Sequence, residues 1–116
     1  MARLTTAPRR GDVYWVALDP VLGTEIKKTR PAVIVSNDSC NRHGTRVVVL
    51  PVTSNVESLY PGEASIEVDG KPARALGDQI RSIDKTRLRE RIGRLDPDEM
   101  IRIDEALRIT LALSFP

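Results

Sequence analysis

A chain of 116 residues is long enough for one hydrophobic core and too short for two domains, and its formal net charge is only +2. The single cysteine, Cys40, and the single histidine, His43, exclude an internal disulfide and a metal site built from Cys and His ligands, so we expect a cytoplasmic protein without a metal or other cofactor. No stretch has the apolar length of a signal peptide or a membrane helix, so we expect no membrane association.

The N-terminal part predicts a tail, one buried strand and a long connection. Residues 1–9 are polar and basic, so we expect a flexible tail followed by a single domain over residues 10–116. The run 12–18 carries β-branched and aromatic residues on both faces, which is typical of a strand buried on both sides. Residues 19–29 are polar and contain Pro and Gly, so they should lead the chain out of the core.

Two further strands are predicted at residues 31–37 and 45–55. Pro31 fits the first position of a strand, because no ladder donor is needed there, and Pro51 indicates an edge or a bulge. The residues between the two strands, 38–44, are expected to form a turn.

The second half of the chain continues with short strands. The runs 64–70 and 73–83 are separated by Asp69-Gly70, a strong hairpin signal. The stretch 82–93 predicts one short helical turn before a last strand. Strands at this spacing are typical of a small barrel or a strongly bent sheet.

The C-terminal segment changes to a helical period. Asp96 is a candidate N-cap, Pro97 fits the first helical position, and Glu99 completes a capping box. Apolar residues then recur at helical spacing, at Met100, Ile103, Leu107 and Leu111. The sequence therefore predicts one mainly β domain closed by a C-terminal amphipathic helix.

The basic residues are mostly arginine, with fourteen Arg against four Lys. A planar guanidinium suits bidentate phosphate contacts, which favours a nucleic-acid ligand, but an arginine-rich genome gives the same bias. The chain has only four aromatic residues, so a sheet face that stacks successive bases is not available. We therefore expect any grip on RNA to depend on hydrogen bonds and charge.

Three polar residues stand at the ends of two predicted strands. Arg30 lies at the entry of the second strand, and Thr53 and Ser54 lie at the exit of the third, so antiparallel pairing would bring them to the same end. RNA cleavage suits such a group, because the substrate supplies its own nucleophile, the 2′-hydroxyl, and the protein must hold and neutralise the phosphate. The alternative is that Arg30 is a flanking charge and Thr53 caps a strand end.

Other reactive side chains have plainer explanations. We expect His43 to be a solvated turn residue, Cys40 to be inert because no nearby charge activates it, and Trp15 to lie in the core or an interface. A basic cluster could line an RNA groove but is more simply a solvated face. Its members are Lys85, Arg87, Arg89, Arg91 and Arg94.

Four segments in this order resemble the MazF/PemK family of toxins. They are RRGDVYWVALDPVLGTEIKKTRPAVIVSN, LPVTSN, DQIRSIDKTRL and DEALRITLAL, and together they cover nearly the whole chain. The resemblance implies a small SH3-like β-barrel with a C-terminal helix. It also implies a sequence-specific, metal-independent endoribonuclease that cuts single-stranded RNA, often mRNA, and leaves a 2′,3′-cyclic phosphate and a 5′-hydroxyl.

The resemblance extends to individual residues. Arg30 and Thr53 match the catalytic arginine and threonine of the family. The residues implied to bind RNA are Gly23, Thr24, Glu25, Lys28, Ser54, Asp78 and Gln79. Some PemK-type members carry an arginine where this chain has Leu76. They also carry a histidine near the start of the loop before the catalytic arginine, where this chain has none, so the identity of the general base is left open. Glu25 is a candidate for that base, and the alternative is a solvated loop carboxylate.

Finally, the resemblance implies partners. Members act as homodimers and are neutralised by a cognate MazE-like antitoxin whose acidic, flexible tail covers the RNA groove. The alternative from another class is a non-enzymatic toxin resembling CcdB, which binds DNA gyrase through its C-terminal helix. Such a protein would not need Arg30 and Thr53 at strand ends, so the sequence favours the ribonuclease.

Overall fold

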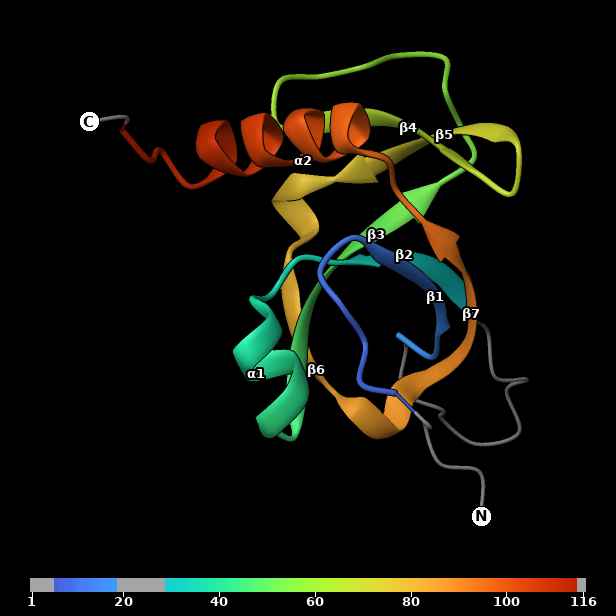
Figure 1. Ribbon diagram of the computed structural model, residues 1–116. Coiled ribbons are helices and arrows are strands. Elements are labelled where there is room, and N and C mark those ends of the chain that lie inside the picture. The colour runs from blue at the N-terminus through green and yellow to red at the C-terminus, as the bar shows by residue number, and fades with distance from the viewer. Residues whose placement is uncertain (1–5, 19–28, 115–116) are drawn as a thin grey trace, which may run out of the picture.

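The computed structural model describes residues 6–18 and 29–114, which form strands, α-helices and short 3-10 helices (Figure 1). The strands are β1 (Asp12–Val16), β2 (Arg30–Ile34), β3 (Arg46–Thr53), β4 (Glu63–Val68), β5 (Lys71–Leu76), β6 (Arg81–Asp84) and β7 (Leu88–Arg94). The helices are α1 (Asp38–His43), α2 (Pro97–Thr110) and the 3-10 turns η1 (Gly77–Gln79) and η2 (Lys85–Arg87). Over these two ranges, no helix is long and apolar enough to cross a membrane.

The strands join in one antiparallel sheet that curls into a half-open barrel. Neighbours follow the order β4-β5-β3-β2-β1-β7, and β6 also pairs with β3. The long strand β3 changes partner along its length, because its first half pairs with β6 and its end pairs with β5. Figure 1 shows α2 lying across the β4–β5 end of the sheet. This confirms the predicted mainly β fold with a C-terminal helix.

Both faces of the central strands are buried. Val13, Val33 and Leu50 stand side by side on one face and pack with Ile103 and Ala106 of α2. The alternate residues of these strands form a second cluster together with residues of β6 and β7. It contains Tyr14, Val16, Ala32, Ile34, Val47, Val49, Ile83 and Leu88. The first strand is thus buried on both sides as predicted, with the exception of Trp15.

Helix α2 begins at the capping box that the sequence predicted. The Asp96 carboxylate accepts the backbone N–H of Glu99 at 2.8 Å, and the Glu99 carboxylate accepts that of Asp96 at 2.9 Å. The other Glu99 oxygen accepts the Glu67 N–H of β4 at 2.7 Å. Because Glu99 serves both the helix and the sheet, it fixes the start of α2 against β4.

The predicted turn at residues 38–44 is wrong, because the chain forms the short helix α1 there. Asn37 caps this helix by accepting the Cys40 N–H at 2.8 Å. Asn41 is fully buried and donates to the Ser36 carbonyl oxygen at 2.8 Å. The Ser36 hydroxyl in turn accepts the Val48 N–H of β3 at 3.0 Å. These polar contacts anchor one helical turn that has no apolar period in the sequence.

The N-terminal residues close to β1 are packed on the domain. Pro8, within the predicted tail of residues 1–9, is buried, and residues 1–5 of that tail lie outside the described residues. The Asp12 carboxylate, only 3% exposed, accepts the Arg9 N–H at 2.8 Å and pairs with Arg94 at 2.9 Å. Burial raises the pKa of the neighbouring Tyr14 phenol, and the Asp12 charge raises it further.

The predicted strand over residues 73–83 is interrupted by η1. The Gly77 N–H donates to the Gly62 carbonyl oxygen at 3.0 Å, and Thr110 of α2 lies against both glycines. A Cβ on Gly77 would stand 2.3 Å from that carbonyl oxygen and 2.8 Å from the Thr110 hydroxyl. The close approach of three segments therefore requires glycine and ends β5 before β6 begins.

We predict that Gly77→Ala lowers the free energy of unfolding by about 1–3 kcal/mol, because the backbone must shift to admit the methyl group. Gly93→Ala is the matched control, since a Cβ there meets nothing within 4 Å. It should change stability by less than about 0.5 kcal/mol. Urea unfolding of both variants checks this, and equal losses would contradict the packing argument.

Candidate active site

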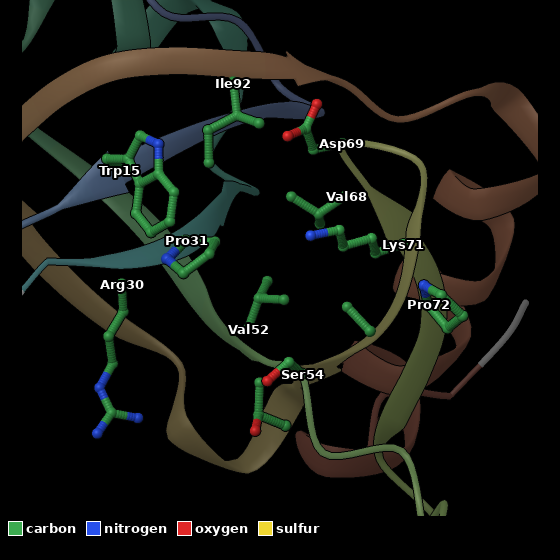
Figure 2. Close-up of a pocket in the computed structure, with 12 residues that line it drawn as sticks. Trp15, Arg30, Pro31, Val52, Ser54, Val68, Asp69, Lys71, Pro72 and Ile92 are labelled. Carbon is green, nitrogen blue, oxygen red and sulfur yellow. The ribbon is translucent and has the colours of Figure 1, made fainter.

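A cleft of about 400 Å³ opens on the sheet face that α2 covers only in part (Figure 2). Trp15 and Pro31 are register partners on β1 and β2. This pair lies two residues away from the pair Val13 and Val33, toward the start of β2. Val13 and Val33 lie in the cluster with α2, whereas Trp15 and Pro31 line the cleft. The apolar wall of the cleft therefore continues the hydrophobic core to the protein surface.

Arg30, Thr53 and Ser54 lie together at the edge of this cleft. Strand β2 begins at Arg30 and β3 ends at Thr53, and their antiparallel register pairs Ala32 with Pro51. All three polar residues line the cleft, and Figure 2 shows the Arg30 and Ser54 side chains at its edge. The structure thus brings them together as the antiparallel pairing predicted.

The donors at this edge are free to meet a ligand. The Thr53 hydroxyl accepts the Asn55 N–H at 3.2 Å, which leaves its own proton available for donation. Arg30 is exposed, and within the described residues its side chain has no hydrogen-bond or ion-pair partner. A guanidinium fork and a hydroxyl at one cleft edge are suited to the nonbridging oxygens of a phosphate.

The end of β3 is held in place from its other side by Arg74. Arg74 is the register partner of Thr53 on β5, and it donates to the Asn55 carbonyl oxygen at 2.5 Å. It also pairs with Glu63 at 2.6 Å, and both side chains are largely buried, at 13% and 12% exposed. Glu63 in turn accepts the Tyr60 N–H at 3.0 Å. This network fixes the backbone that follows Thr53.

We predict that Arg74→Met lowers the free energy of unfolding by about 1–3 kcal/mol, because the largely buried Glu63 carboxylate loses its partner. It should also lower kcat for the RNA cleavage that the sequence resemblance implies, since the backbone beside Thr53 loses its anchor. Adding Glu63→Gln removes the unpaired charge and should recover part of the stability but not the rate. Urea unfolding and single-turnover kinetics check this, and recovery of both would contradict a positioning role.

The other predicted RNA-binding residues lie elsewhere. Gly23, Thr24, Glu25 and Lys28 are outside the described residues. Asp78 and Gln79 are exposed on η1 and do not line the cleft. Turn η1 joins β5 to β6, and both strands pair with the edge of β3 that faces away from β2. Asp78 and Gln79 therefore flank β3 on the side opposite Arg30.

The structure adds three residues to the cleft that the sequence did not suggest. Trp15, expected in the core or an interface, is 41% exposed and lines the cleft. Asp69 and Lys71 line it from the β4–β5 turn, where Asp69 and Gly70 have φ values of 55° and 76°. This confirms the predicted hairpin, but its approach to β1 depends on the curl of the whole sheet.

Four of the five members of the basic cluster, all except Lys85, have side chains engaged with the protein itself. Arg91 and Arg94 pair with Asp12, while Arg87 and Arg89 donate to backbone carbonyl oxygens. His43 and Cys40 are exposed on α1 and do not line the cleft. Among the residues that the structure describes, no group of His, Cys, Asp or Glu side chains could hold a metal ion.

Comparison with known proteins places these features in a family. Residues 9–111 match the model of the PemK-like, MazF-like toxin of type II toxin–antitoxin systems. Endoribonuclease MazF9 of Mycobacterium tuberculosis is 42% identical over 117 residues, which cover 90% of this chain and 97% of that protein. Endoribonuclease EndoA of Bacillus subtilis is 38% identical over 111 residues, which cover 90% of this chain and 95% of that protein.

A solved structure agrees with the sequence relatives. It is a mycobacterial endoribonuclease in complex with its cognate antitoxin, 29% identical, with a TM-score of 0.78 over 95% of this chain and 100% of that one. The family model, the relatives and the shared fold each cover most of the molecule, including β2 and the end of β3. The chain therefore belongs to the PemK-like, MazF-like toxins of type II toxin–antitoxin systems.

Proposed function

We propose that the protein is a sequence-specific endoribonuclease toxin that cleaves single-stranded RNA, with mRNA as its main target, at the cleft edge formed by Arg30, Thr53 and Ser54. The single observation that carries this proposal is the meeting of Arg30 and Thr53 at one cleft in a chain of this family. Relatives named as endoribonucleases match 90% of the chain, which supports the same activity here.

The proposed reaction is an internal transesterification. The 2′-oxygen attacks the adjacent phosphorus, the bond from phosphorus to the 5′-oxygen breaks, and the products are a 2′,3′-cyclic phosphate and a 5′-hydroxyl. The 2′-hydroxyl proton passes to a base, and one proton is delivered to the leaving 5′-oxygen. No metal or cofactor takes part, because the nucleophile belongs to the substrate and the protein supplies charge and alignment.

Arg30 and Thr53 have different roles at the phosphate. The guanidinium neutralises the charge that grows on the nonbridging oxygens, and because it carries N–H donors and no acceptor it acts as a donor and never as a base. It can also protonate the 5′-oxygen as that atom leaves. The Thr53 hydroxyl donates a second hydrogen bond and fixes the phosphate in line, and Glu25 is the candidate that receives the 2′-proton.

The RNA strand extends beyond the cleft in this proposal. Asp78 and Gln79 on η1 are exposed beside β3, where they can contact nucleotides that pass over the end of that strand. The segment with Gly23, Thr24, Glu25 and Lys28 enters β2 directly before Arg30, so it is close in sequence to the reacting phosphate. These contacts would supply the sequence preference.

We also assign two protein partners. A cognate MazE-like antitoxin is supported by the related mycobacterial endoribonuclease that was solved with its own antitoxin. A homodimer is supported by apolar side chains left exposed at the end of α2 and in the residues after it, which are Ile109, Leu111 and Leu113. Light scattering of the purified protein should give twice the chain mass.

The gyrase-binding alternative has less support. The family match and both named endoribonucleases cover the segments with Arg30 and Thr53, which a gyrase poison would not need. Its determinants would lie on α2 instead. Intact RNA after incubation with the folded wild-type protein would favour this alternative.

The test is a primer-extension map of a long single-stranded RNA incubated with the protein in EDTA. We expect cuts at one recurring short sequence, a 5′-hydroxyl on the downstream product, and loss of the cuts in Arg30→Ala and Thr53→Ala. Cleavage that requires an added metal ion, or that persists in both variants, would contradict the proposal.

A further inference from the structure

Trp15 is an exposed aromatic residue on an otherwise buried strand. Its side chain is 41% exposed, whereas Val13, Tyr14 and Val16 are each 3% exposed or less. Tryptophan offers more apolar surface than almost any other residue, so leaving it in water forgoes much of its stabilising burial. The position therefore favours a binding role over a packing role.

The indole of Trp15 faces the cleft and is surrounded by apolar side chains. Pro31, Val52 and Ile92 line the same cleft as Trp15, and Figure 2 shows the indole beside Pro31 and Ile92, with Arg30 at the edge below. The volume, about 400 Å³, is within the usual range for small-molecule sites. An open apolar wall next to a phosphate-binding edge has the layout of a nucleotide site, in which the base lies one sugar away from the phosphate.

The opposite side of the cleft is polar. Asp69 and Lys71 line it from the β4–β5 turn, and Figure 2 shows Lys71 across the cleft from Trp15. Within the described residues neither side chain has a hydrogen-bond or ion-pair partner. Asp69 belongs to the tight two-residue turn Asp69-Gly70 and Lys71 follows it directly, so both are held on a rigid hairpin. A carboxylate and an ammonium together can read the donors and acceptors on the edge of a base.

We propose that this cleft is a nucleobase subsite in which Trp15 stacks on a base next to the scissile phosphate, while Asp69 and Lys71 contact the polar edge of that base. The inference rests on the proposed ribonuclease function and adds a part of its substrate recognition. It replaces the expectation that RNA binding depends on hydrogen bonds and charge alone. An apolar side chain of a protein partner would use the wall but would leave Asp69, Lys71 and Arg30 without ligands.

The first test uses Trp15 as its own reporter, because it is the only tryptophan in the chain. The probe is a 2′-O-methyl oligonucleotide that carries the mapped cut sequence and cannot be cleaved. We expect saturable quenching of the tryptophan fluorescence and a loss of acrylamide accessibility on binding. An indole already shielded from acrylamide in the free protein, or unaffected by a bound oligonucleotide, would overturn the proposal.

The second test pairs a variant with an altered substrate. Stacking on one aromatic side chain corresponds to about 5- to 150-fold in affinity, so Trp15→Leu should raise KM by a factor in this range with kcat nearly unchanged. Trp15→Phe should restore most of the affinity, because it keeps an aromatic face. Tyr60→Leu is the control, since it removes an exposed aromatic side chain outside the cleft but keeps the backbone N–H that Glu63 accepts, and it should change neither constant.

An abasic scan identifies the base. At one position next to the cut, removal of the base should weaken binding to the wild type by the same factor and should have little effect in Trp15→Leu. Equal abasic effects in both proteins at every position would refute the stacking contact while leaving cleavage intact. Absence of any RNA cleavage by the wild type would instead remove the ribonuclease function itself, so the two failures are distinguishable.

Discussion

Replacing Arg30 by alanine should lower kcat for RNA cleavage by about 10²–10³-fold, because loss of one preorganised donor to a developing oxyanion has an effect of this size. The expected loss is in kcat more than in KM, since the growing negative charge exists only in the transition state. Arg30 is exposed at the start of β2, so the substitution should leave the melting temperature nearly unchanged. Single-turnover cleavage of a short fluorogenic RNA measures the rate.

Two further variants separate charge from geometry at this position. Arg30→Lys keeps the charge but loses the planar fork, so its rate should lie between those of the wild type and the alanine variant. Arg42→Ala removes an exposed arginine on α1 that does not line the cleft, and it should cleave at the wild-type rate. Equal rates for Arg30→Ala and Arg42→Ala would remove Arg30 from the mechanism.

Ile103→Ala should lower the free energy of unfolding by about 2–5 kcal/mol, a large part of the roughly 5–15 kcal/mol that stabilises a domain. Ile103 is fully buried and joins α2 to the core cluster with Val13, Val33 and Leu50. Truncation leaves a cavity where the helix meets the sheet, because the backbone on both sides is fixed by regular hydrogen bonds.

Ile101→Ala is the matched control for this substitution. It makes the same chemical change on the same helix, but Ile101 is 65% exposed and its loss should change stability by less than about 0.5 kcal/mol. Urea unfolding at one fixed protein concentration compares the two variants. Similar losses for both would mean that α2 is not anchored by its inner face.

Local signals in the sequence were enough to predict most of the fold. The Asp69-Gly70 hairpin and the Asp96 capping box depend only on neighbouring residues, and the structure contains both. The meeting of Arg30 and Thr53 was also predictable, because it requires only that two successive strands pair antiparallel. Each of these features depends on neighbouring residues or on the pairing of two successive strands.

Features that depend on distant packing could not be predicted. The sequence predicts Trp15 in the core or an interface, and its exposure follows from how far α2 extends over the sheet. Lys71 reaches the same cleft only because the sheet curls. Helix α1 was missed because the contacts of the buried Asn41 with Ser36 replace an apolar period. Trp15 and Lys71 are too far apart in the sequence for a local pattern to predict that they line the same cleft.

We propose that the cleft edge with Arg30 and Thr53 cleaves RNA through the substrate's own 2′-hydroxyl. The most direct measurement compares two short RNAs in EDTA, identical except for a single 2′-deoxy nucleotide directly before the mapped cut. We expect the all-ribose RNA to be cut to a 2′,3′-cyclic phosphate and the 2′-deoxy RNA to stay intact while it still binds. Cleavage of the 2′-deoxy RNA at the same position would show that the 2′-hydroxyl is not the nucleophile and would contradict this mechanism.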